Sequence, residues 1–122
     1  MRAGLIVIAA IVFAASAAFA GEPMAPSDIK ATFFNGQPFT AAAPTGVKFT
    51  MTFTPDGKMK REALAPPGKT SVGTWKLNAK GFCTSWERAK SHCFTVIPNS
   101  DNKWSVQEIA TTIAITIAVW SK

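Results

Sequence analysis

The chain has 122 residues, of which 48% are hydrophobic, and it carries a formal net charge of +6. This length suits one small domain with a single core. Its seven acidic residues are scattered, which argues against a calcium site and against the paired carboxylates of a glycosidase. No nucleic-acid-binding motif accompanies the positive charge. We therefore expect a soluble surface, with an anionic envelope component rather than nucleic acid as a further candidate partner.

Residues 1–20 have the organisation of a secretory signal peptide. Arg2 gives a positively charged start, a long apolar run follows, and Ala18-Phe19-Ala20 provides the small residues that signal peptidase requires. The run is shorter than the roughly 20 apolar residues of a spanning helix. The first cysteine lies far beyond the cleavage site, which excludes a lipoprotein anchor. We expect residues 21–122 to form one periplasmic or secreted domain without a membrane span.

The mature domain is predicted to begin with one short helix of about two turns. Ser27-Asp28 offers an N-cap, and Ile29 and Phe33 lie on one helical face. Asn35-Gly36 supplies the residues that typically end a helix. The apolar face of this helix predicts that it packs against a core.

The segments that follow have the pattern of β-strands joined by tight turns. From Val47 to Thr54 apolar and polar residues alternate strictly, so every second residue from Val47 to Phe53 is expected to face the core. Pro55-Asp56-Gly57 then makes a turn. Short, evenly spaced strands predict an antiparallel meander that forms a small barrel or half-barrel, with the helix plugging one end. The further strands are predicted at residues 58–64, 71–77, 82–86, 91–97, 104–108 and 111–120.

The last predicted strand, residues 111–120, is largely apolar on both faces. One face carries Ile113, Ile115, Ile117 and Val119, and the other carries Ala114, Thr116, Ala118 and Trp120. Such a strand is expected to be buried on both sides or to lie in a closed barrel. The alternative is a membrane or self-association surface.

Cys83 and Cys93 are the only cysteines, and a lone pair in an exported chain is usually bonded. If the turn between the strands at 82–86 and 91–97 centres on Arg88, the two cysteines face each other within reach of a disulfide. Their spacing is not that of a CxxC redox pair, and His92 has no second ligand pair to complete a zinc site. We therefore predict a structural disulfide, no metal site and no cofactor.

The sequence offers little for catalysis and more for binding. His92 is the only histidine, and no G-x-S-x-G motif presents a nucleophile, so we expect no enzyme. Four tryptophans recur about once per strand or hairpin, and they either fill the core or form a stacking surface for a ligand in a barrel mouth. In the second case Trp75 and Trp86 are the candidate ligand contacts. They lie on the strands that flank the turn at 78–81 and can share a face.

An ordered set of short motifs resembles a pattern in small, uncharacterised secreted proteins of Gram-negative bacteria. The motifs F-x-P-D-G, G-T-W and C-x-x-W with a second cysteine about ten residues later correspond to Phe53–Gly57, Gly73–Trp75, Cys83–Trp86 and Cys93. The resemblance covers about residues 29–106. It implies a periplasmic β-rich domain and supplies no active site. The G-x-W element is also similar to that of lipocalin-type barrels, although this chain is too short for a full lipocalin.

Two classes of function are consistent with these features. The first is a non-enzymatic binding module for a small apolar or carbohydrate ligand. The second is a protein-interaction domain, such as an inhibitor of an envelope-degrading enzyme. The positive net charge is poorly matched to a basic target such as lysozyme.

Overall fold

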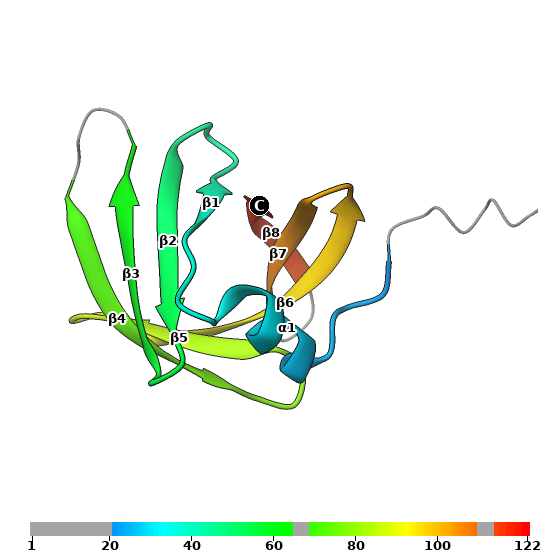
Figure 1. The fold of residues 1–122 in the computed structure, drawn as a ribbon, viewed down its shortest axis with the longest axis horizontal. Helices are drawn as coiled ribbons and strands as arrows, with labels where there is room; N and C mark the ends of the chain where they lie inside the picture. The colour runs from blue at the N-terminus through cyan, green and yellow to red at the C-terminus, as the bar shows by residue number, and fades with distance from the viewer. Residues whose placement is uncertain (1–20, 65–68, 110–113) are drawn as a thin grey trace, which may run out of the picture.

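The computed structural model describes residues 21–64, 69–109 and 114–122, and the predicted signal peptide lies outside them. In these residues the chain forms one helix and eight strands, which pair in sequence order and close into an antiparallel barrel (Figure 1). The predicted meander is therefore confirmed as a closed barrel. The elements are α1 (Pro26–Phe33), β1 (Phe39–Ala42), β2 (Lys48–Thr54), β3 (Lys58–Ala63), β4 (Thr70–Leu77), β5 (Phe82–Trp86), β6 (Ser91–Ser100), β7 (Lys103–Ile109) and β8 (Ala114–Ser121).

Strand β2 has the alternation that the sequence predicts. Met51 and Phe53 are buried inside the barrel, and Phe49 is partly buried on the same face. Val47 is the exception, because it lies before the strand and its side chain is 44% exposed. The carbonyl of Val47 accepts a hydrogen bond from the amide of Ala43, so this residue belongs to the turn between β1 and β2.

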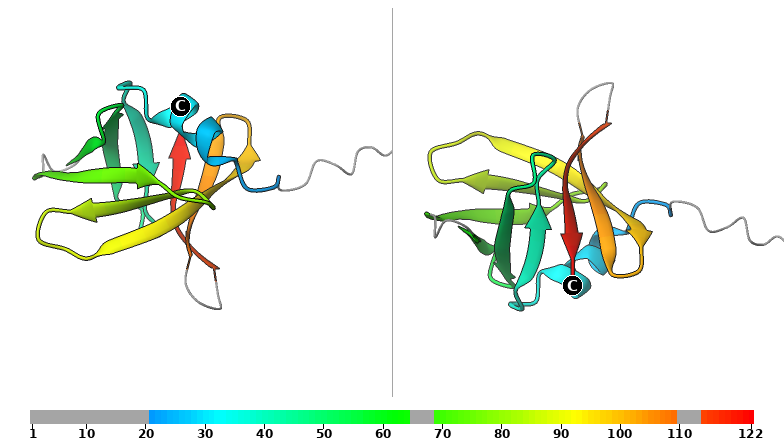
Figure 2. Two further views of the ribbon diagram at one scale, coloured as in Figure 1. Left: turned by 90° about the horizontal axis from the view of Figure 1, so that it is seen from below. Right: turned by 90° about the horizontal axis from the view of Figure 1, so that it is seen from above.

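Helix α1 plugs one end of the barrel, as predicted. Ile29 and Phe33 are fully buried, and Phe33 makes edge contacts with the rings of Phe39, Trp104 and Trp120. Figure 2 shows the helix next to the chain's C-terminus, where Lys122 Nζ donates a hydrogen bond to a helix carbonyl. Phe33 of the helix therefore lies at the centre of a cluster of aromatic side chains in the core.

The predicted N-cap at Ser27-Asp28 is wrong. The helix begins at Pro26, and its N-cap is Ala25, which makes no side-chain cap hydrogen bond. Proline is favoured at the start of a helix because its fixed φ suits the first turn. It lacks an N–H, but an N–H at that position would have no acceptor within the helix. The carbonyl of Ala25 accepts the amides of Asp28 and Ile29, so the first turn is satisfied by the backbone.

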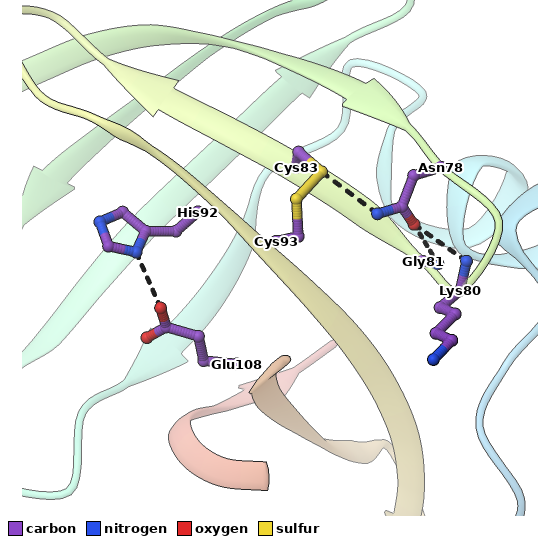
Figure 3. Close-up of a disulfide and its surroundings, with 7 residues drawn as sticks. All are labelled: Asn78, Lys80, Gly81, Cys83, His92, Cys93 and Glu108. Atoms are coloured by element: carbon purple, nitrogen blue, oxygen red, sulfur yellow. Dashed lines mark hydrogen bonds and ion pairs between the residues drawn. A yellow bond between two sulfur atoms is a disulfide. The ribbon is translucent and has the colours of Figure 1, made fainter. Parts of the chain in front are cut away.

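The hairpin of β5 and β6 has the predicted register and the predicted disulfide. Cys83 lies directly opposite Cys93 and is bonded to it, and Arg88 adopts a positive φ of 67° in the turn. The side-chain amide of Asn78 donates to the Cys83 sulfur, and its oxygen accepts the amide of Gly81 (Figure 3). The disulfide is thus joined to the turn that precedes β5.

Strand β6 is longer than predicted. It continues to Ser100 instead of ending at residue 97, so only two residues separate it from β7, with Asn102 at a φ of 59°. Pro98 pairs with Trp104, and the ladder then shifts register. Such an irregularity lets a strand contain a proline, because the regular ladder hydrogen bond is not required there.

Strand β8 pairs with β7 on one edge and with β1 on the other, which closes the barrel. Residues 111–113 of the predicted strand lie outside the described residues. Ala118 pairs with Val106 but Thr116 pairs with Gln107, so Ile117 is an extra residue in the ladder. This bulge interrupts the alternation. The strand lies in a closed barrel, which is one of the two arrangements expected for it, and it is not buried on both sides, because Ile115 is 58% exposed.

Candidate functional site

The end of the barrel opposite α1 contains polar side chains on its interior face. Arg61 lies opposite Met51, a buried core residue, so both side chains point into the barrel. Thr84 and His92 form a pair next to the buried pair Phe82 and Phe94, two residues along each strand and hence on the same face. Antiparallel alternation thus places a cation, a hydroxyl and an imidazole around one mouth.

A cavity of about 130 Å³ occupies this part of the interior. Its walls are apolar except for two side chains, Arg61 and Thr84. Aromatic rings from β2, β5, β6 and β8 line it, among them Phe49, Trp86, Phe94 and Trp120. An apolar cavity of about 150 Å³ accepts a benzene molecule, so this space suits a group of about one aromatic ring.

Arg61 is held against two of these rings. Its guanidinium carbon is 4.4 Å from the centre of the Trp86 ring and 5.0 Å from that of Phe49. Partial burial lowers the pKa of Arg61 below its usual range, but an arginine stays charged in proteins. The attraction between the cation and the aromatic faces offsets part of the free-energy cost of removing the guanidinium from water.

No carboxylate of the described residues lies within 4.0 Å of the Arg61 guanidinium, since the one ion pair found there joins His92 to Glu108. All seven acidic side chains of the chain fall in the described ranges. Glu62, the nearest acid in sequence, belongs to the opposite face of β3, where it accepts a hydrogen bond from Thr70. Arg61 is therefore a positive charge without an internal counter-ion.

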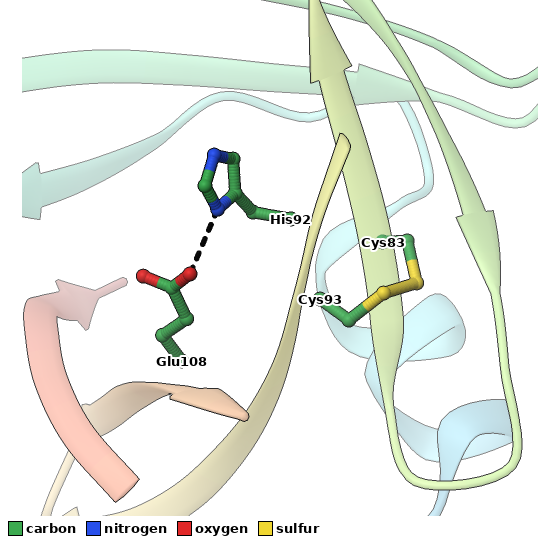
Figure 4. A network of polar contacts seen from close by, with 4 residues as sticks. All are labelled: Cys83, His92, Cys93 and Glu108. Atoms are coloured by element: carbon green, nitrogen blue, oxygen red, sulfur yellow. Dashed lines mark hydrogen bonds and ion pairs between the residues drawn. A yellow bond between two sulfur atoms is a disulfide. The ribbon is translucent and has the colours of Figure 1, made fainter. Parts of the chain in front are cut away.

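The His92–Glu108 pair stands at the rim of the same mouth. His92 Nδ1 lies 2.7 Å from Glu108 Oε2, and the two side chains are 53% and 36% exposed. Figure 4 shows the pair on one side of β6 and the disulfide on the other. A histidine base that is oriented by a carboxylate supplies two of the three groups of a nucleophilic catalytic site. However, no serine, threonine or cysteine hydrogen-bonds to His92 in the part of the chain described here.

The two tryptophans predicted as ligand contacts share the interior face but occupy different places. Trp75 is 8% exposed, packs 4.5 Å from Phe34 and donates its indole N–H to the carbonyl of Thr54. It belongs to the helix-side core. Trp86 is partly buried and lines the cavity. The structure therefore brings only Trp86 to the candidate site.

Sequence reasoning missed Arg61, Phe49 and the His92–Glu108 pair. The alternation along β2 and β3 could have revealed Phe49 and Arg61. Phe49 lies on the inward face of β2, and Arg61 is two residues from Met59 and so lies on the same inward face of β3. The pair has no local signal, since its members are 16 residues apart on different strands.

A second hollow, of about 580 Å³, lies on the outer face of β2–β5. Lys58 and Lys60 border it together with Val72, which is 48% exposed. It is a surface depression rather than an enclosed site. Among the described residues no group of three or more histidine, cysteine or acidic side chains is placed to hold a metal ion.

Fold and site together define a small eight-stranded barrel, plugged by a helix at one end and holding an apolar cavity with one unpaired cation toward the other. No protein-family model, curated protein or solved structure matches this chain. Within the described residues, no helix has the length and hydrophobicity needed to cross a membrane. The disulfide is compatible with an oxidising compartment.

Proposed function

We propose that this protein is an exported, non-enzymatic binding module that holds a small, largely apolar ligand inside its barrel. The observation that carries the proposal is the cavity of about 130 Å³ lined by aromatic rings. Ligand sites are typically concave and apolar, with a few polar groups that orient the ligand. This cavity has that composition.

The composition of the walls favours an apolar ligand over a carbohydrate. A buried hydroxyl without a hydrogen-bond partner is costly, so a sugar needs many polar groups around it. The cavity offers the side chains of Arg61 and Thr84 alone. Trp86 supplies an aromatic face for an apolar ring, which agrees with the role proposed for it from the sequence.

Export is part of the proposal. The apolar run and the Ala18-Phe19-Ala20 pattern support a cleaved signal peptide, and the Cys83–Cys93 bond suits the periplasm or the extracellular space. Sequencing the N-terminus of the exported protein tests this part. We expect the mature chain to begin at Gly21, and an intact Met1 would contradict it.

Binding can be tested by nuclear magnetic resonance with benzyl alcohol as a neutral probe and phenylacetate as an anionic one. We expect the amide resonances of the lining residues Phe94, Val106 and Ala118 to shift in a saturable manner. Ala41→Leu places extra methyl groups in the cavity, because Ala41 is buried in its wall. This variant should lose binding while its circular dichroism spectrum is retained.

The matched control is Ala42→Leu, which makes the same substitution one residue further along β1. Ala42 pairs with Lys48 and Val119, so its side chain points out of the barrel. We expect this variant to bind as the parent does. The proposal fails if neither probe shifts the lining residues.

A further inference from the structure

We propose that the cavity selects a small organic carboxylate, whose anionic group pairs with Arg61 while an apolar part about the size of a phenyl ring fills the cavity. The inference rests on the proposed function and names the class of ligand. Four features of the mouth lead to it.

The first feature is the position of Arg61 within its own basic cluster. Lys58, Lys60 and Arg61 are close in sequence, but Lys58 and Lys60 point outward and are exposed. Arg61 shares the inward phase of Met59, which is 3% exposed. A charge on the apolar side of a strand costs free energy unless it is paired. Lys58 and Lys60 do not incur this cost, because their side chains are exposed.

The second feature is the absence of an internal partner. None of the carboxylates in the described residues is within 4.0 Å of Arg61, and Glu108, the acid on the same rim, is engaged by His92. The positive charge of Arg61 is therefore available to a ligand. Because Arg61 is the one cation among the residues that line the cavity, it matches a single negative charge.

The third feature is the orientation imposed by the rings. The guanidinium lies over Trp86 at 4.4 Å and near Phe49 at 5.0 Å. Stacking uses the flat face of a guanidinium and leaves its edge N–H groups free to donate, and two parallel N–H groups match a carboxylate. The rings thus hold the cation ready for a bidentate contact.

The fourth feature is the surroundings of the charge. The rest of the cavity wall, apart from Thr84, is apolar, and a charge pair is stronger where water is partly excluded. The volume limits the buried part of the ligand to about one aromatic ring or a short alkyl chain. Together these features fit an aryl or short-chain carboxylate.

The experiment compares phenylacetate with phenylacetamide, which has the same shape without the charge, by isothermal titration calorimetry. We expect the wild-type protein to bind phenylacetate about tenfold or more tightly than the amide, because a charged hydrogen-bonded pair replaces a neutral contact. Arg61→Met should remove this preference and leave amide binding nearly unchanged. Arg61→Lys should keep part of it, since the charge remains without the fork of donors.

The matched control is Lys60→Met, which removes one positive charge from the adjacent, outward-facing position. We expect it to leave the preference intact. An equal loss in Lys60→Met and Arg61→Met would show that net charge rather than Arg61 attracts the anion, and would overturn the inference.

The remaining outcomes separate this inference from the proposed function. Equal affinities for phenylacetate and phenylacetamide, unchanged in Arg61→Met, would mean that Arg61 only packs against Trp86; the binding module would stand and its carboxylate selectivity would not. Binding of neither compound would overturn both. Thermal unfolding of each variant checks that loss of binding does not reflect loss of the fold.

Discussion

The two ends of the barrel are built from the same strands, yet one is filled and the other holds a cavity. At the helix end Phe33 and Phe34 are at most 1% exposed, and Phe34 stacks on Phe53 with ring centres 4.4 Å apart. At the other end Trp86 and Arg61 remain partly exposed around a cavity of about 130 Å³. Both regions are rich in aromatic rings, so aromatic content does not distinguish core from binding site.

The difference lies in what completes each end. Helix α1 inserts Ile29 and Phe33 between the strands, and the ring of Phe33 packs against those of Trp104 and Trp120. No described helix covers the other end, where the strands end in a polar rim that includes His92 and Glu108. A filled end gives stability through close packing, whereas a partly empty end keeps aromatic faces available to a ligand.

The same substitution at each end should have different effects. Trp75→Ala removes a buried ring and its hydrogen bond to Thr54, and we expect a loss of about 3–5 kcal/mol in the free energy of unfolding. Trp86→Ala should cost less than about 2 kcal/mol, because that ring is only partly buried, but it should abolish ligand binding. Urea denaturation and calorimetric titration measure the two effects. A larger stability loss for Trp86→Ala would contradict this division of the barrel.

Loss of the disulfide should weaken the barrel as a whole rather than either end. The closed loop is short, and the chain-entropy model gives a stabilisation of about 2.7 kcal/mol. We expect the double variant Cys83→Ser, Cys93→Ser to lose about this amount in urea denaturation and to keep its preference for phenylacetate, because the bond is on the side of β6 opposite to His92. A selective loss of ligand binding with unchanged stability would show that the hairpin positions the mouth instead.

The smallest expected effect concerns the turn beside the filled end. The hydroxyl of Thr54 donates a hydrogen bond to Asp56 and lowers the pKa of that carboxyl below its usual 3.8. Because this pKa is lower in the folded protein than in the unfolded chain, the stabilisation is complete above the unfolded value and is lost as the pH falls through the folded one.

Thr54→Val should therefore be less stable than the wild type at neutral pH, and the gap should narrow as the pH falls through the lowered pKa of Asp56 in the folded protein. Urea denaturation at neutral pH and at a series of acidic pH values measures the gap. Thr52→Val, on the same face of β2, serves as the control and should show a gap independent of pH. A constant gap for Thr54→Val would rule out the linkage to Asp56.

Local patterns in the sequence were sufficient for several parts of the fold. The alternation of β2, the turn at Pro55-Asp56-Gly57 and the register of Cys83 against Cys93 each depend on residues close in the chain. The apolar pair Ile29 and Phe33 likewise marks the buried face of α1. These features are predictable because side-chain direction along a strand or helix follows from its period alone.

Other parts of the fold had no such local signal. Strand β1, four residues long, was not predicted, because its residues FTAA form too short a run to show a period. Its pairing with β8 closes the barrel. The bulge at Ile117 was also absent from the sequence pattern, since an extra residue is defined only against the partner strand β7.

The candidate site divides in the same way. Alternation along the strands was enough to predict that Trp75 and Trp86 share a face, and the same local property of β3 points Arg61 inward, although that was missed. The contact of Trp75 with the helix, and the place of Trp86 and Arg61 beside a cavity, follow from packing between elements. Depth along the barrel axis depends on the register between strands and on what covers each end. Those relations join residues far apart in the chain, and no periodicity within one strand contains them.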